Sequence, residues 1–258
     1  MTLATLPLAW EDEASLSHTA RVARDAPRID WNSFITREFN WQRGEHVAII
    51  APTGTGKTVL LTQLVRQRRF VVVFATKPRD SSMDALIDTG FRKFERWPLE
   101  PSLVSPRRVL WPNAKTLDAE ERQKTVFQSA MGAIYRAGGW TVAVDELYYI
   151  VDRLRLSREI KLYLLQGRSL DLSLILATQR PAWVPLEVYD QSTHLFFGRD
   201  NDERNLDRLS GISWRSAVLV RSLIANLERH QWLYINTRTG QMFRTRVPAD
   251  LARKEDAQ

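Results

Sequence analysis

The sequence contains no cysteine, which excludes disulfide bonds and cysteine-ligated zinc, and its four histidines are too scattered to form a good metal site. Its longest apolar runs, residues 70–76 and 172–178, are far shorter than the ~20 residues that a membrane-spanning helix needs. The apolar residues 1–8 lack a basic leader, and acidic residues follow them, so no signal peptide is expected. These absences predict no direct membrane insertion and suit a reducing compartment.

The chain is nevertheless long and apolar enough to fold around a sizeable core. It has 258 residues, of which 44% are hydrophobic. A chain of this length buries about 70–75% of the surface that it exposes when unfolded. The formal net charge is +7. A basic surface favours phosphate-rich partners, but many proteins are mildly basic, so charge alone leaves nucleic-acid binding open.

Apolar β-branched runs alternate with helical patterns along most of the chain. Strands are expected at 46–50, 70–76, 108–111, 141–144, 172–178 and 194–197, and helices at 59–69, 117–137, 148–166, 201–209 and 214–227. Residues 231–237 and 241–247 indicate a terminal β-hairpin. The pattern predicts an α/β domain with a mostly parallel sheet flanked by helices. We assign it to residues 37–250, preceded by an N-terminal arm, 1–36, and followed by a polar tail, 251–258.

Residues 51–58 form a glycine-rich loop between an expected strand and an expected helix, the context that a phosphate-binding loop requires. Gly54 and Gly56 let backbone N–H groups surround phosphate oxygens, and the helix N-terminus adds positive potential. Lys57 supplies a charge for the phosphates of ATP, and the Thr58 hydroxyl can bind Mg²⁺. Ala51 stands where such loops usually have their first glycine. The nucleotide-binding candidates are Pro52, Thr53, Gly54, Thr55, Gly56, Lys57, Thr58 and Val59.

Two carboxylates follow the expected strand at 141–144. Asp145 and Glu146 would emerge at the carboxyl edge of the sheet, where open α/β sheets bind their ligands. We expect Asp145 to hold the Mg²⁺ shell and Glu146 to act as the general base for the attacking water. A strand end that merely caps the next helix is the plainer interpretation of the same residues.

The segment 167–181 carries the most specific pattern, an Ala-Thr-Gln-Arg-Pro sequence that ends a strand. It resembles the FtsK/HerA superfamily of ring-forming DNA motors, whose core is a RecA-like P-loop NTPase fold. The resemblance implies that Gln179 senses the γ-phosphate and that Arg168 reaches the ATP of a neighbouring subunit. Both residues are therefore catalytic candidates, together with Lys57 and Glu146.

This resemblance implies an ATP hydrolase that moves double-stranded DNA as a homo-oligomeric ring, which we expect to be a hexamer. The chain is similar in size to genome-packaging ATPases, and a docking partner at a membrane or capsid is expected. We expect a cytoplasmic protein, or one at a virion vertex if the chain is viral. The alternative is a non-translocating ATPase switch for phage assembly or secretion, like the zonula-occludens-toxin-like proteins. A kinase-like enzyme fits poorly, because no small-substrate site is apparent.

Two basic clusters remain open in function. Lys77 and Arg79 follow the second expected strand and would face the pore of a ring if they contact DNA. Residues 91–97 interleave arginine and lysine with aromatic side chains, a pattern that suits either nucleic-acid binding or an ordinary solvated surface.

Overall fold

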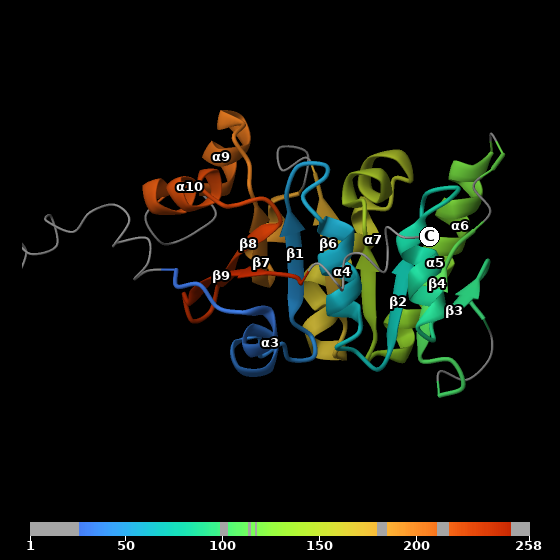
Figure 1. Cartoon of the computed structure of the whole chain (residues 1–258). Helices are drawn as coiled ribbons and strands as arrows, with labels where there is room; N and C mark the ends of the chain where they lie inside the picture. The colour runs from blue at the N-terminus through green and yellow to red at the C-terminus, as the bar shows by residue number, and fades with distance from the viewer. Residues whose placement is uncertain are drawn as a thin grey trace, which may run out of the picture.

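A computed structural model describes residues 26–98, 103–112, 115–116, 118–179, 185–210 and 217–248. Within these ranges, nine strands form one sheet in the order β3-β4-β2-β5-β6-β1-β7-β8-β9, and Figure 1 shows them running in this order across the molecule. The first seven in this order pair in parallel, whereas β7, β8 and β9 pair antiparallel. The expected parallel α/β sheet with a C-terminal hairpin is therefore confirmed.

The strands are β1 (His46–Ile50), β2 (Val71–Phe74), β3 (Arg92–Phe94), β4 (Arg107–Leu110), β5 (Thr141–Val144), β6 (Ser173–Thr178), β7 (Ser192–Gly198), β8 (Gln231–Asn236) and β9 (Met242–Arg246). The central ones, β1, β2, β5 and β6, are buried along their whole length. This burial on both faces explains why they appear in the sequence as continuous apolar runs instead of alternating patterns.

Helices cover both faces of the sheet (Figure 1). The core cluster on one face includes side chains of α6 (Ala119–Ala137), α7 (Ser157–Gln166), α8 (Leu186–Asp190) and α10 (Ala217–Ala225). The cluster on the other face includes side chains of α3 (Trp31–Ser33), η1 (Phe34–Glu38), α4 (Lys57–Val65) and α5 (Ser81–Asp88). The remaining elements are η2 (Tyr149–Arg153), η3 (Gly167–Leu170) and α9 (Glu203–Ser210). No helix in the described ranges has both the length and the apolar character to cross a bilayer.

The single helix expected over 148–166 is wrong. A π-helical segment, η2, ends at Arg153, and α7 begins only at Ser157. Between them Arg155 adopts a positive φ of 58°, which interrupts the helical backbone. No glycine or proline marks this break, so the residue pattern gave no signal for it.

The chain preceding β1 packs against its own sheet from residue 26 onward. Trp31 and Phe34 are buried, and the Phe34 ring lies 4.9 Å from that of Tyr234 on β8. The N–H of Ile29 donates to the carbonyl of Arg244 on β9. Residues 26–36 of the expected arm therefore contribute to the core, whereas residues 1–25 and the expected tail 251–258 lie outside the described residues.

Candidate functional site

The predicted site residues meet because four adjacent strands end at the same edge of the sheet. Strands β2, β5, β6 and β1 are neighbours and all run parallel. The glycine-rich loop follows β1, Gln179 follows β6, and Asp145 follows β5. Lys77 follows β2 after a short connection. The carboxyl edge of a parallel sheet is the usual place for a ligand in this fold class.

The loop after β1 has the backbone of a phosphate cradle. Gly54 and Gly56 adopt φ values of 78° and 93°, a region that side chains with a Cβ rarely enter. Helix α4 starts at Lys57, two residues before the expected 59, so its first N–H groups point into the loop. The Thr55 hydroxyl donates to the carbonyl of Pro52 at 2.7 Å and holds the turn closed.

Lys57 lies against the loop. Its Nζ donates to the carbonyls of Ala51 and Pro52, each at 2.8 Å. Burial lowers the pKa of Lys57, although the nearby carboxylates of Asp145 and Glu146 oppose this shift. A phosphate group in the cradle would give the ammonium a counter-charge in place of neutral carbonyls.

Thr58 and Asp145 form the pair that could hold a metal ion. The Thr58 hydroxyl lies 3.0 Å from Oδ1 of Asp145, which is only 9% exposed. A hydroxyl and a carboxylate are hard oxygen ligands, and Mg²⁺ commonly binds through one or two such groups plus phosphate oxygens and water. The donor set therefore fits Mg²⁺ held between these two residues and the phosphates of a nucleotide.

Lys77 belongs to this site, which the sequence did not indicate. Its Nζ lies 3.2 Å from Oδ2 of Asp145 and 3.3 Å from Asp80. Burial alone would lower the pKa of Lys77, but the two carboxylates outweigh it and raise the pKa. Its contact with Asp145 joins the end of β2 to the predicted metal site.

Two more of the catalytic candidates, Gln179 and Glu146, flank the loop and the metal pair. Gln179 Oε1 accepts a hydrogen bond from the Thr53 hydroxyl, so the end of β6 touches the phosphate loop directly. Glu146 is half-buried beside Asp145 and contributes to the electrostatic environment of Lys57. Residues 180–184, which include the Arg-Pro that completes the motif, lie outside the described residues.

A cavity of about 320 Å³ adjoins the loop on the side of β7. It is lined by Pro52, Gly54, Thr55, Arg199, Asp200, Asn201, Arg229 and His230. Nδ1 of His230 lies 3.2 Å from the carbonyl of Thr55, and His230 has a positive φ of 60°. The sequence did not predict that Arg229 and His230 belong to this site. They directly precede β8, and no local residue pattern there indicates a neighbour of the phosphate loop.

Arg168 does not join this constellation. It is exposed in η3, and its backbone lies beside Gly44, just before β1 begins. The phosphate loop follows the other end of β1, so the two lie at opposite edges of the sheet. The expected role of Arg168 at the ATP of a neighbouring subunit stays a prediction.

Solved structures share this architecture at low sequence identity. The DNA-packaging ATPase B204 of Sulfolobus turreted icosahedral virus is 17% identical with a TM-score of 0.59, covering 79% of this chain and 98% of that one. VirB4 of Thermoanaerobacter pseudethanolicus is 12% identical with a TM-score of 0.56, covering 79% and 89%. The type VII secretion ATPase EccC of Thermomonospora curvata is 15% identical with a TM-score of 0.53, covering 83% and 26%. No protein-family model and no curated protein matches the sequence.

The fold and the loop define the class: this chain has the fold of a P-loop ATPase. The expected resemblance to FtsK/HerA-type ATPases is confirmed at the level of that fold. The genome packaging NTPase B204 of Sulfolobus turreted icosahedral virus 2 is 16% identical with a TM-score of 0.55, covering 79% of this chain and 98% of that one. It was solved in complex with ATP-gammaS, which supports nucleotide binding in this fold.

Proposed function

We propose that this protein hydrolyses Mg-ATP in a ring of identical subunits and uses the energy to move double-stranded DNA. The observation that carries the proposal is the joining of three strand ends at one site. Thr58 of the loop contacts Asp145 after β5, and Thr53 of the loop contacts Gln179 after β6. A glycine-rich turn that binds no ligand would not require either of these two contacts.

The residues divide the chemistry of hydrolysis among them. Lys57 and the N–H groups of the loop bind the phosphates. Thr58 and Asp145 would hold Mg²⁺, which would supply positive charge against that of the phosphates. Glu146 accepts a proton from the attacking water, and Gln179 orients that water through its uncharged amide. The cavity beside Thr55, with Arg199 and Arg229 at its wall, receives the nucleoside end of ATP.

The DNA part of the proposal rests on the charge of the chain, because the fold is shared with ATPases of different tasks. B204 is described as a DNA-packaging ATPase, whereas EccC is described as a secretion ATPase. The net charge of +7 favours a polyanionic partner. The second candidate is therefore an ATPase switch that acts in assembly or secretion without moving DNA.

One measurement separates the two candidates. The rate of ATP hydrolysis is determined with and without linear double-stranded DNA, with the Glu146→Gln variant as the background control. Stimulation of the wild-type rate by DNA supports the motor. A rate that DNA leaves unchanged, in a protein that hydrolyses ATP, supports the switch.

A further inference from the structure

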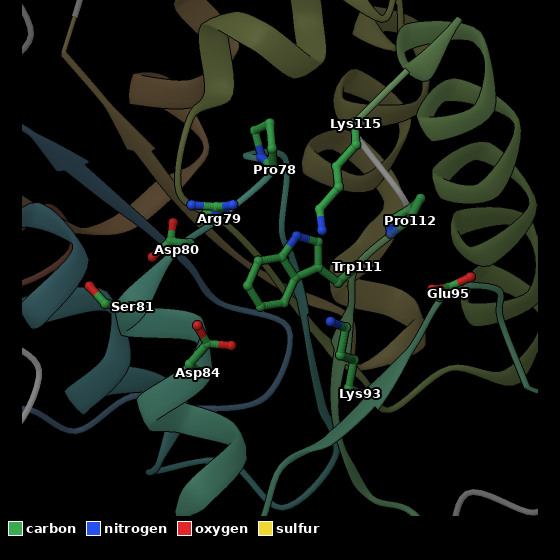
Figure 2. A pocket seen from close by; sticks show the side chains of 10 residues that line it. All are labelled: Pro78, Arg79, Asp80, Ser81, Asp84, Lys93, Glu95, Trp111, Pro112 and Lys115. Carbon is green, nitrogen blue, oxygen red and sulfur yellow. The ribbon is translucent and has the colours of Figure 1, made fainter. Parts of the chain in front are cut away.

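Two cavities at the carboxyl edge of the sheet differ in what they offer a ligand. The larger one, of about 470 Å³, lies between the connection from β2 to α5, strand β3 and the segment that follows β4 (Figure 2). The described residues that line it include three cations, Arg79 and Lys93 among them, and three carboxylates, so it has no surplus charge with which to hold an anion. The smaller cavity, of about 320 Å³, lies against the phosphate loop, and one of its lining residues, His230, contacts the backbone of that loop.

The carbonyl of Thr55 depends on His230 for its hydrogen bond. Nδ1 of His230 lies 3.2 Å from this oxygen, and within the described part of the chain no other group donates to it. A carbonyl can only accept, so Nδ1 carries the proton in this contact. Helix α4 leaves the oxygen unsatisfied, because the hydrogen bond at its amino end runs from the N–H of Leu60 to the carbonyl of Gly56, one residue later.

The Thr55 carbonyl and the Gly56 N–H belong to the same peptide unit. No cis peptide bond occurs in the described ranges, and in a trans unit the C=O and the N–H point in opposite directions. The Gly56 N–H itself donates no hydrogen bond to any described residue. His230 therefore holds the oxygen on its own side of the loop and leaves the Gly56 N–H facing away from it, available to an acceptor.

The backbone at both ends of this contact is unusual. Gly56 has a φ of 93°, and a Cβ placed on it would lie 3.5 Å from Nδ1 of His230, so the imidazole covers this glycine closely. His230 has a φ of 60°, a value that residues with a Cβ rarely adopt, and it directly precedes β8. Uncommon backbone conformations cluster at functional sites, where they direct a side chain. Here the turn before β8 directs the imidazole to the phosphate loop.

We propose that His230 is a positioning residue for phosphate binding, which holds the Thr55–Gly56 peptide with the Gly56 N–H turned toward the phosphates of the nucleotide. This inference rests on the proposed function, because it requires the loop to bind phosphate. Without His230 the peptide can rotate, and ordering it again when the ligand binds lowers the affinity. The N–H contacts the phosphates before and during hydrolysis, so its loss raises KM and leaves kcat nearly unchanged.

The test compares two substitutions that both tolerate a positive φ. His230→Asn keeps a donor, because the asparagine Nδ2 can take the place of the histidine Nδ1, whereas His230→Gly removes the side chain without straining the turn. The affinities of the full chain for ATPγS and for pyrophosphate are measured with Mg²⁺ present. We expect His230→Gly to bind both ligands about threefold to tenfold more weakly, the effect of one neutral hydrogen bond. His230→Asn should stay within about twofold of wild type.

Pyrophosphate is the probe that separates the phosphate cradle from the nucleoside end of ATP, which this cavity would also receive. The matched control is Arg155→Gly, because Arg155 is another exposed residue with a positive φ, 58°, and lies outside both cavities. Its affinities should stay within about twofold of wild type. Melting temperatures are measured for every variant, together with KM and kcat for ATP.

Each result decides the inference. Weaker binding of both ligands by His230→Gly, recovered in His230→Asn at an equal melting temperature, supports it. If the glycine variant loses affinity for ATPγS alone, His230 contacts the nucleoside end and the inference is wrong. It is also wrong if the asparagine variant binds as weakly as the glycine variant, or if a folded glycine variant binds both ligands as wild type does, and the proposed function then stands. If the wild-type protein binds neither ligand, the proposed function fails, and the inference fails with it.

Discussion

A methyl group on Gly198 would lie 2.6 Å from the Cβ of Ala51, closer than side-chain carbons come in real proteins. Gly198 ends β7, and Ala51 opens the phosphate loop after the neighbouring β1. Ala51 also stands where such loops usually have a glycine. The space for its methyl group therefore comes from the missing side chain of Gly198 on the adjacent strand.

This contact predicts a pair of compensating substitutions. Gly198→Ala should press on Ala51, destabilise the fold by about 1–3 kcal/mol and weaken ATP binding. The added strain is steric only, because the φ of Gly198 lies outside the left-handed region. Ala51→Gly in the same chain should recover most of the loss, although Trp232 remains 3.3 Å from the new methyl group. Urea unfolding measures the stability, and nucleotide titration measures the affinity for ATP. If Gly198→Ala alone had wild-type stability, the steric explanation would be wrong.

Substitutions of Lys57 and Glu146 should impair different steps of the ATPase reaction. Lys57→Ala removes the main counter-charge of the phosphates and should abolish nucleotide binding or turnover. Glu146→Gln keeps Thr58 and Asp145 in contact but removes the proton acceptor, so it should bind ATP and not hydrolyse it. Nucleotide affinity and hydrolysis rate are measured for both. Hydrolysis by Glu146→Gln at the wild-type rate would show that another group is the base.

His46 makes the stability of the fold depend on pH. It is 2% exposed, and burial lowers its pKa from 6.5 to about 4. Its Nδ1 accepts the N–H of Leu174 on β6 at 3.1 Å, so protonation there would break a contact between β1 and β6. Between pH 6.5 and 4, His46 becomes protonated in the unfolded chain but stays neutral in the folded chain. Stability is therefore lost as pH falls through this range, by up to about 3 kcal/mol from this residue.

The matched variant is His46→Asn, whose amide oxygen can accept the same N–H without titrating. The free energy of unfolding is measured against pH for both proteins. Glu45 and His194 also have lowered pKa values, the latter mainly through burial, and both keep their contribution in the variant. The difference between the two curves isolates His46. Parallel curves from pH 6.5 to 4 would show that its pKa is not depressed.

Much of the fold was predictable because its central strands are buried on both faces. The sequence predicted β1 and β5 with the bounds that the structure has, since each is a short apolar run beside a motif. It missed α5, which buries only Met83 and Leu86, and β3, which has three residues and two exposed charges. Elements with so few apolar residues form because neighbours cover them, which local periodicity does not record.

The candidate site likewise has a part that the sequence predicted and a part that it did not. The loop and the Asp145-Glu146 pair are each a continuous stretch of sequence, so the residue pattern alone predicts their chemistry. Lys77, Gly198 and His230 matter because strands or loops distant in sequence bring them to Asp145, Ala51 and Thr55, and no spacing rule encodes these three contacts.

Arg168 is the residue whose predicted role depends on a neighbouring subunit. It lies beside Gly44, before the amino end of β1, whereas the phosphate loop begins after the carboxyl end of that strand. A parallel strand of 5 residues spans roughly 17 Å, and so the exposed guanidinium is poorly placed for the ATP of its own chain. In a head-to-tail ring the next subunit can present its phosphates to that edge.

We therefore predict that Arg168→Ala loses hydrolysis by about 10³-fold or more, the range of arginine fingers, and that the defect is complemented in trans. Arg168→Ala keeps its own loop, and Lys57→Ala keeps its arginine, so mixed rings contain interfaces that are intact on both sides. Mixing the two should recover part of the ATPase rate. The control mixture is Lys57→Ala with Glu146→Gln, because both defects lie in the subunit's own site and no interface is repaired. Failure to recover activity in a mixture that demonstrably co-assembles would refute the trans role, as would normal turnover by Arg168→Ala alone.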